Sequence, residues 1–131
     1  MTDPALAPFR TLLPELPRAG EFRRPGPLPG AARALALAAT AIELSGSKRM
    51  LALVCADAHE ASTLAAEIAW CAPALRVLEF SDWETLAYDH FSPHPDLVSD
   101  RLRALHALAE RRCDVLVVAA TTLALRVTPR A

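Results

Sequence analysis

The sequence predicts an α/β domain built on a parallel β-sheet. Three short apolar runs, each long enough for a strand, alternate along the chain with segments of helical composition or spacing. Parallel strands need crossover connections, usually helices, and this alternation supplies them. Hydrophobic residues make up 53% of the 131 residues, which is enough to build a core. We therefore expect one domain, or part of one.

The N-terminal segment, residues 1–27, has a different composition from the rest. Seven of the 11 prolines fall at or before Pro29, and proline disfavours both helix interiors and sheets. We expect the main domain to comprise residues 28–131. Within the proline-rich segment, four apolar residues between Pro8 and Pro17 predict a short amphipathic turn, so we expect the segment to dock on some other surface. They are Phe9, Leu12, Leu13 and Leu16.

The first helix is predicted over residues 31–44. This run is rich in alanine and leucine, the best helix formers, and the Ser-Gly-Ser sequence at 45–47 ends it. The following residues, 50–56, are almost all apolar. Such a run is typical of a strand that is covered on both faces.

A second helix is predicted over residues 58–71, ended by Pro73. Helical spacing places five small or apolar side chains on one face of it. They are Ala61, Leu64, Ala65, Ile68 and Ala69. Residues 75–80 then form a second predicted strand.

A third helix is predicted over residues 97–110, with Asp96 as its N-cap. Arg111 and Arg112 follow it, where cations favour the negative end of the helix dipole. Residues 114–120 are rich in β-branched side chains and predict the third strand, and residues 121–127 begin another helix. The expected apolar face of the third helix consists of Val98, Leu102, Leu105 and Ala109.

Charge and cysteine content exclude several classes of protein. The 14 basic and 15 acidic residues give a net charge of −1, which does not fit a free-standing nucleic-acid binder. Cys55, Cys71 and Cys113 are widely spaced within apolar runs, so we interpret them as buried free thiols rather than as disulfides or zinc ligands. No signal peptide and no run of about 20 apolar residues is present, which predicts a cytoplasmic protein without membrane contact.

Residues 81–102 form an unusual connection between the second strand and the third helix. A plain connector needs about 2 to 6 residues, whereas this one is longer and contains Trp83, Tyr88 and Phe91. Aromatic side chains of this kind anchor long loops on a core or bind partners. For Arg101 and Arg103, in the helix that follows, a solvated helix face is the expected location.

Carboxylates and histidines in the same segment could form a metal or acid–base site. Their spacing argues against it, because Pro93 breaks the helical periodicity between His90 and His94. We therefore expect solvated or capping roles for these polar residues. They are Asp82, Glu84, Asp89, His90, His94 and Asp96.

A glycine turn enters the first predicted helix, in the place where an α/β fold would carry a phosphate loop. A working loop needs several glycines, a lysine and a Ser or Thr. Here the residues are Gly30, Ala31, Ala32, Arg33 and Ala34, which lack that chemistry. The sequence at 45–49, Ser-Gly-Ser-Lys-Arg, follows a helix and precedes a strand, the reverse of the required order.

The long connector also resembles the signature of the bacterial transcription-repair coupling factor (Mfd) family. Residues 28–34 resemble the vestigial phosphate loop of that family, and residues 114–123 resemble its next strand and turn. The likeness covers about residues 28 to 129; Ala87 departs from the proline that the family often has. The residues that carry the resemblance are Asp82, Trp83, Glu84, Thr85, Leu86, Tyr88, Asp89, Phe91, Ser92, Pro93, His94, Asp96, Ser99, Arg101 and Leu102.

This resemblance implies a fold and a function. The chain would be the family's first domain, similar to the first domain of UvrB, with a RecA-like fold and a degenerate phosphate loop that no longer binds nucleotide. The full-length family protein is an ATP-dependent translocase on double-stranded DNA, which displaces stalled RNA polymerase at lesions and recruits UvrA for nucleotide excision repair. ATP and Mg²⁺ would be bound by later domains.

The resemblance further implies that the chain is an incomplete fragment of such a domain. It would act as a non-catalytic scaffold, without cofactor or metal, through intramolecular contacts with later domains. The interaction residues carried over from the family signature are Asp82, Trp83, Glu84, Tyr88, Asp89, Phe91, Ser92, Pro93, His94 and Arg101.

Two other hypotheses stay open. One is a small stand-alone α/β hydrolase or metal enzyme that uses Asp89, His90 and His94. Metal content and the effect of His94→Ala would separate it from the scaffold. The other is a free-standing regulator that descends from a truncated gene.

Overall fold

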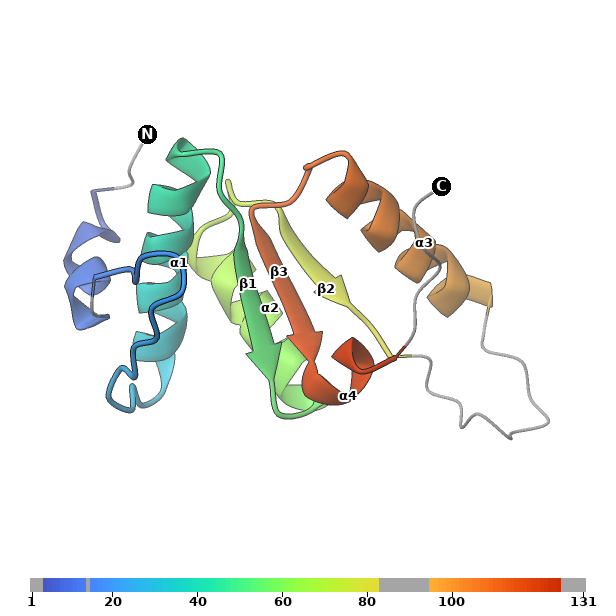
Figure 1. Ribbon diagram of the computed structural model, residues 1–131, viewed down its shortest axis with the longest axis horizontal. Helices are drawn as coiled ribbons and strands as arrows, with labels where there is room; N and C mark the ends of the chain where they lie inside the picture. The colour runs from blue at the N-terminus through green and yellow to red at the C-terminus, as the bar shows by residue number, and fades with distance from the viewer. Residues whose placement is uncertain (1–3, 14, 83–94, 126–131) are drawn as a thin grey trace.

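The computed structural model describes residues 4–13, 15–82 and 95–125 of the chain, and confirms the α/β class (Figure 1). A short 3₁₀ helix, η1 (Ala7–Leu12), precedes the first α-helix. Helices and strands then alternate as α1 (Ala31–Gly46), β1 (Leu51–Cys55), α2 (Ala58–Cys71), β2 (Val77–Phe80), α3 (Pro95–Ala109), β3 (Val115–Ala119) and α4 (Ala120–Leu123).

The three strands of the described chain form one parallel sheet in the order β1-β3-β2. The last strand in sequence therefore lies between the first two. Val115 of β3 is in register with Leu51 of β1 on one side and with Val77 of β2 on the other. Crossover helices are what parallel neighbours require, as the sequence predicted.

Helices cover the two faces of the sheet unequally (Figure 1). α1 and α2 pack on one face, where the main core includes Ile68 of α2 and Val115 and Val117 of β3, all fully buried. α3 packs on the opposite face over a smaller cluster that contains Phe80 and Val118. The larger core therefore lies between α1, α2 and the sheet.

The prediction that the first strand is covered on both faces is wrong for the described chain. Ala52 and Val54 of β1 are exposed, and Val54 keeps 56% of its surface accessible. β1 is an edge strand, whereas α3 packs against β2 at the other edge of the sheet. The apolar run therefore predicts the strand correctly, but it does not predict which faces of the strand are covered by other elements.

Two details of the third helix also differ from the sequence prediction. The helix begins at Pro95, so Asp96 lies in its first turn instead of capping it, where a carboxylate still favours the helix dipole. Leu102 is 62% exposed, while Arg101 and Ala104 are buried. The helix is thus rotated so that Arg101, and not Leu102, faces the sheet, while Leu105 packs on the cluster around Phe80 as its predicted position requires.

The second helix follows its prediction closely. It runs from Ala58 to Cys71, and its expected apolar positions 61, 64, 65 and 68 are buried. Ala69 is exposed, as is its neighbour Trp70. The buried face is therefore narrower than the predicted one.

The expected docking of the N-terminal segment is seen in η1. Leu6 is buried and Phe9 packs on the main core, whereas Leu12 is 43% exposed. The Nε atom of Arg10 lies 2.5 Å from a carboxylate oxygen of Glu43 in α1. This turn is thus held on α1 by both apolar and polar contacts.

The three cysteines are free thiols. Cys55 and Cys113 are buried, as predicted, and Cys71 is half-buried. Burial raises the pKa of each thiol, so all three favour the unreactive protonated form.

Within the described ranges no helix has the length and apolar character that a membrane crossing requires.

α1 and α3 end in the same unusual way. In each, a cation adopts positive φ just past the helix: Lys48 at 56° and Arg111 at 53°. The backbone N–H groups of Arg49 and Arg112, one residue later, donate to carbonyls of Leu44 and Ala107, at 2.9 and 2.8 Å. This is the Schellman arrangement, whose left-handed position is usually occupied by glycine.

Replacing Lys48 by glycine should therefore stabilise the chain. We expect the free energy of unfolding to rise by about 0.5–1 kcal/mol relative to Lys48→Ala, because glycine adopts the left-handed conformation without steric cost. Both variants remove the charge, so the difference between them isolates the backbone term. Urea denaturation of the two variants measures it, and equal stabilities would contradict the prediction.

Candidate functional site

Most of the predicted signature residues lie outside the described part of the chain. These are Trp83, Glu84, Tyr88, Asp89, Phe91, Ser92, Pro93 and His94, together with His90 of the alternative metal site. The structure describes the two ends of this segment, at Asp82 and Arg101, and the glycine turn at residues 30–34. These two regions form the candidate functional site at the carboxyl edge of the sheet.

Arg101 is buried, with only 3% of its surface exposed. Its guanidinium carbon lies 4.3 Å from the ring centroid of Phe80, the last residue of β2. Its Nη1 atom donates a hydrogen bond to the carbonyl oxygen of Ser81. The expectation of a solvated helix face is therefore wrong for Arg101, while Arg103 is exposed as expected.

These contacts fix the point where the signature segment leaves the sheet. Burial lowers the pKa of Arg101, and the negative charge of Asp82 opposes that shift. Asp82 and Arg101 thus interact electrostatically, although 19 positions separate them in sequence. Arg101 in α3 holds the residues that follow β2 by a stacking contact, a hydrogen bond and a charge.

A cavity of about 300 Å³ lies beside this anchor, at the carboxyl ends of β2 and β3. His59, Ser62, Asp82 and Thr122 are among its lining residues. The hydroxyl oxygen of Thr122 is buried and has no hydrogen-bond partner among the described residues. The cavity offers polar groups, but in the described chain no hydrogen bond joins His59 to a serine or carboxylate, so no nucleophile–base pair is formed.

The glycine turn begins α1 without the features of a phosphate cradle. Gly30 occupies the N-cap position with φ of 55°, and no side chain caps the helix. The guanidinium of Arg33 lies 2.5 Å from a carboxylate oxygen of Glu60 in α2. The cation of this turn is therefore already matched by an acidic partner within the chain.

Glu60 is itself held by the start of α2. Its second carboxylate oxygen accepts a hydrogen bond of 2.9 Å from the N–H of Ala56, and its own N–H donates to Asp57, the N-cap residue. The hydrogen bond from Ala56 and then that from Arg33 lower the pKa of Glu60. This reciprocal cap keeps Glu60 ionised and positioned to hold Arg33.

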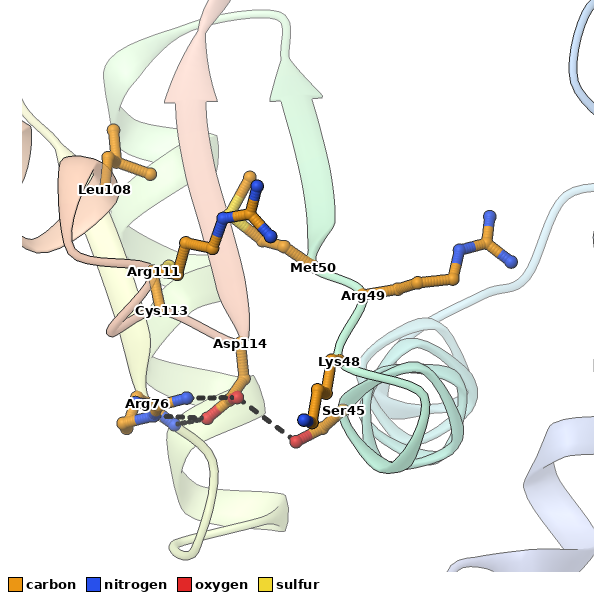
Figure 2. Close-up of a pocket in the computed structure, with 9 residues that line it drawn as sticks. All are labelled: Ser45, Lys48, Arg49, Met50, Arg76, Leu108, Arg111, Cys113 and Asp114. Atoms are coloured by element: carbon orange, nitrogen blue, oxygen red, sulfur yellow. Dashed lines mark hydrogen bonds and ion pairs between the residues drawn. The ribbon is translucent and has the colours of Figure 1, made fainter.

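A third cluster lies at the opposite, amino edge of the sheet (Figure 2). The carboxylate of Asp114 accepts hydrogen bonds from the backbone N–H and from the guanidinium of Arg76, at 2.8–2.9 Å, and from the hydroxyl of Ser45 at 3.1 Å. The bonds from Arg76 are the first cause that lowers the pKa of Asp114 to about 2. Asp114 thereby joins α1, β2 and β3.

Sequence patterns did not single out this cluster or the polar cavity. Ser45, Arg76 and Asp114 are far apart along the chain, and each stands at the end of a different element. The sequence predicted Ser45 only as part of a helix stop, and Arg111 and Arg112 only as cations that match the helix dipole. Within the described ranges no group of three or more His, Cys, Asp or Glu side chains could hold a metal ion.

Comparison with known proteins identifies homologues. The chain is 40% identical over 121 residues to the transcription-repair-coupling factor of Escherichia coli (strain K12), covering 92% of this chain and 10% of that protein. It is 44% identical over 50 residues to the protein of the same name from Haemophilus influenzae, covering 38% of this chain and 4% of that protein. No family model matches the chain. The chain thus spans about a tenth of its first relative, and the resemblance inferred from the sequence is confirmed.

Proposed function

We propose that this chain, a homologue of transcription-repair-coupling factors, is a non-catalytic scaffold domain of UvrB-homology type that works within such a protein. The observation that carries the proposal is the 40% identity to one of these factors along 92% of the chain. A similarity of this extent involves nearly every described element. It supports a shared fold, and with it a shared part in coupling transcription to DNA repair.

The activity of a whole coupling factor is part of the proposal. We infer that the parent protein is an ATP-dependent translocase on double-stranded DNA that displaces stalled RNA polymerase and recruits UvrA. The chain corresponds to about a tenth of its first relative, so ATP and Mg²⁺ would be bound elsewhere in the parent. The role of this domain would then be to position neighbouring modules.

Local geometry supports a scaffold rather than a nucleotide site. Arg33, the cation of the glycine turn, is paired with Glu60, and the turn offers one glycine instead of several. A phosphate bound there would have to compete with a carboxylate 2.5 Å from the guanidinium. A degenerate phosphate loop in a RecA-like fold would have this property.

Thermal unfolding with and without ATP and Mg²⁺ tests this function. We expect no change in Tm, because a scaffold domain without a nucleotide site gains nothing from the ligand. A bound ligand at about a hundred times its Kd would add about 2.7 kcal/mol to the free energy of unfolding, a shift that is easily measured.

Arg33→Ala is the matched variant for this experiment. It removes the only cation of the glycine turn. A rise in Tm with ATP that disappears in Arg33→Ala, or ATP hydrolysis that the same change abolishes, would overturn the scaffold proposal. Adenosine, which lacks phosphates, serves as the control ligand for binding through the base alone.

A further inference from the structure

A basic cleft of about 500 Å³ lies at the amino edge of the sheet, on the side away from the candidate functional site (Figure 2). Lys48 and Arg49 line it from the turn after α1, and Arg111 lines it from the turn after α3. The side chain of Arg49 extends away from the other lining residues (Figure 2). Arg76 and Asp114 form one wall. The cleft is therefore bounded by three separate elements of the fold.

The charges of the cleft do not cancel. Arg76 is matched by Asp114, the one acidic residue among the described residues that line the cleft. Lys48, Arg49 and Arg111 are exposed and form no ion pair with any residue in the described ranges. The ends of α1 and α3 contribute roughly one negative elementary charge together, which leaves about two of the three positive charges unmatched.

The backbone conformation fixes the positions from which two of these cationic side chains extend. Lys48 and Arg111 hold positive φ within the Schellman turns, and each turn is closed by two backbone hydrogen bonds. A non-glycine residue at such a position carries a steric cost. The two cations are thus presented from rigid helix ends on different sides of the cleft.

Apolar side chains lie among the cations. Met50 is 42% exposed in the cleft, and Leu108 of α3 also lines it. A free inorganic anion makes no favourable contact with apolar side chains, whereas a peptide can match both the charge and the apolar area of the cleft. We propose that the basic cleft binds an acidic protein segment that carries an apolar side chain.

A nucleic-acid backbone fits the described surface less well. DNA binding needs cations along a track, because phosphates repeat along the whole strand. Outside the cleft lining, Arg10, Arg33 and Arg103 are each paired with an acidic residue, and Arg101 is buried. Arg112 is exposed next to Arg111, and the exposed Arg18, Arg23 and Arg24 lie in the N-terminal segment. The cations that line the cleft form a compact group, which favours a short acidic segment.

Binding of a labelled peptide to the intact chain tests the proposal. The probe is a fluorescein-labelled peptide of repeated Glu-Glu-Leu, measured by anisotropy. We expect the triple variant Lys48→Asn, Arg49→Gln, Arg111→Asn to weaken binding by at least about tenfold, a loss of about 1.4 kcal/mol. Asparagine tolerates the left-handed backbone at positions 48 and 111, so the helix ends are preserved.

A triple variant elsewhere on the chain is the matched control. Arg18→Gln, Arg23→Gln, Arg24→Gln removes the same charge from exposed residues of the N-terminal segment. Its affinity should stay within about twofold of the original chain, while added salt should weaken the binding to the original chain. A peptide of Glu-Glu-Ser and the variant Met50→Ser should both bind more weakly, because each removes the apolar contact.

Three outcomes would overturn the proposal. Equal losses in the two triple variants would show a general charge effect, and the absence of peptide binding would show that the cleft is not such a site. Tighter binding of an oligodeoxythymidine than of the peptide, lost in the cleft variant, would identify a nucleic-acid site instead. Far-UV circular dichroism checks that each variant is folded.

Discussion

Replacing Arg101 by alanine should lower the free energy of unfolding by about 3 kcal/mol, the largest effect that we expect from one substitution. The change removes a buried charged donor from the carbonyl of Ser81 and leaves a space beside the ring of Phe80. An unsatisfied acceptor and an unfilled space are both costly in a buried site. Urea denaturation monitored by circular dichroism measures the difference.

Arg103→Ala is the matched control, two positions along the same helix. Its side chain is 76% exposed and pairs only with Asp100 of the same helix among the described residues, so we expect a change within about 0.5 kcal/mol. Arg101→Lys should recover little of the loss, because lysine lacks the planar group that stacks on Phe80. Equal effects of the two alanine variants would contradict the anchoring role of Arg101.

Asp114→Asn should lower the free energy of unfolding by about 2 kcal/mol near neutral pH. The carboxylate of Asp114 is held by Arg76 and Ser45, and its pKa falls from 3.8 to about 2 in the folded chain. Asparagine keeps the size of the side chain but not the charge that pairs with the guanidinium. The expected loss follows from this difference in pKa between the folded and unfolded states.

The effect of Asp114→Asn should depend on pH in a defined direction. A carboxyl group with a lowered pKa stabilises the fold above its unfolded pKa of 3.8, and this stabilisation is lost as the pH falls towards 2. The stability difference between the original chain and the variant should therefore shrink from about pH 5 downwards. Glu60, which also has a lowered pKa, is present in both proteins and cancels.

Denaturation of both proteins at several pH values tests this prediction. A stability difference that stays constant from neutral pH to about pH 3 would mean that the ionisation of Asp114 is not coupled to folding. The prediction would also be contradicted by a difference that grows as the solution is acidified.

Local patterns predicted the secondary structure well because the elements obey simple rules. The alanine-rich composition of α1, the apolar spacing of α2 and the β-branched residues of β3 each favour one type of element. The parallel arrangement followed from their alternation. The order of the strands did not, since periodicity along a chain carries no information about which strands become neighbours.

The burial of Arg101 could not be predicted from local sequence patterns. An arginine in a helix is usually solvated, and the pattern of α3 placed Leu102 on its buried face. Burial of Arg101 instead depends on the ring of Phe80 and the carbonyl of Ser81, which come from another element. Contacts of this kind are fixed by tertiary packing, so no local pattern predicts them.

At both edges of the sheet, residue types could be read from the sequence, whereas the contacts between distant residues could not. That residues 30–34 contain one glycine and no lysine could be read from the sequence alone, whereas the pairing of Arg33 with Glu60 could not. Likewise, the basic cleft gathers Lys48, Arg76 and Arg111 from three connections that are far apart in sequence. Only the folded structure shows that these three residues lie close together.

The strand order has a consequence for how the chain folds during synthesis. β1 and β2 are not hydrogen-bonded to each other, because each pairs with β3, which lies between them. The described sheet therefore cannot assemble before Ala119, the last residue of β3, has left the ribosome. Until then, two apolar strands lack a partner. Contacts that join distant parts of a chain form slowly, and unpaired strands favour aggregation, so a chaperone would protect this domain most in the interval before β3 is made.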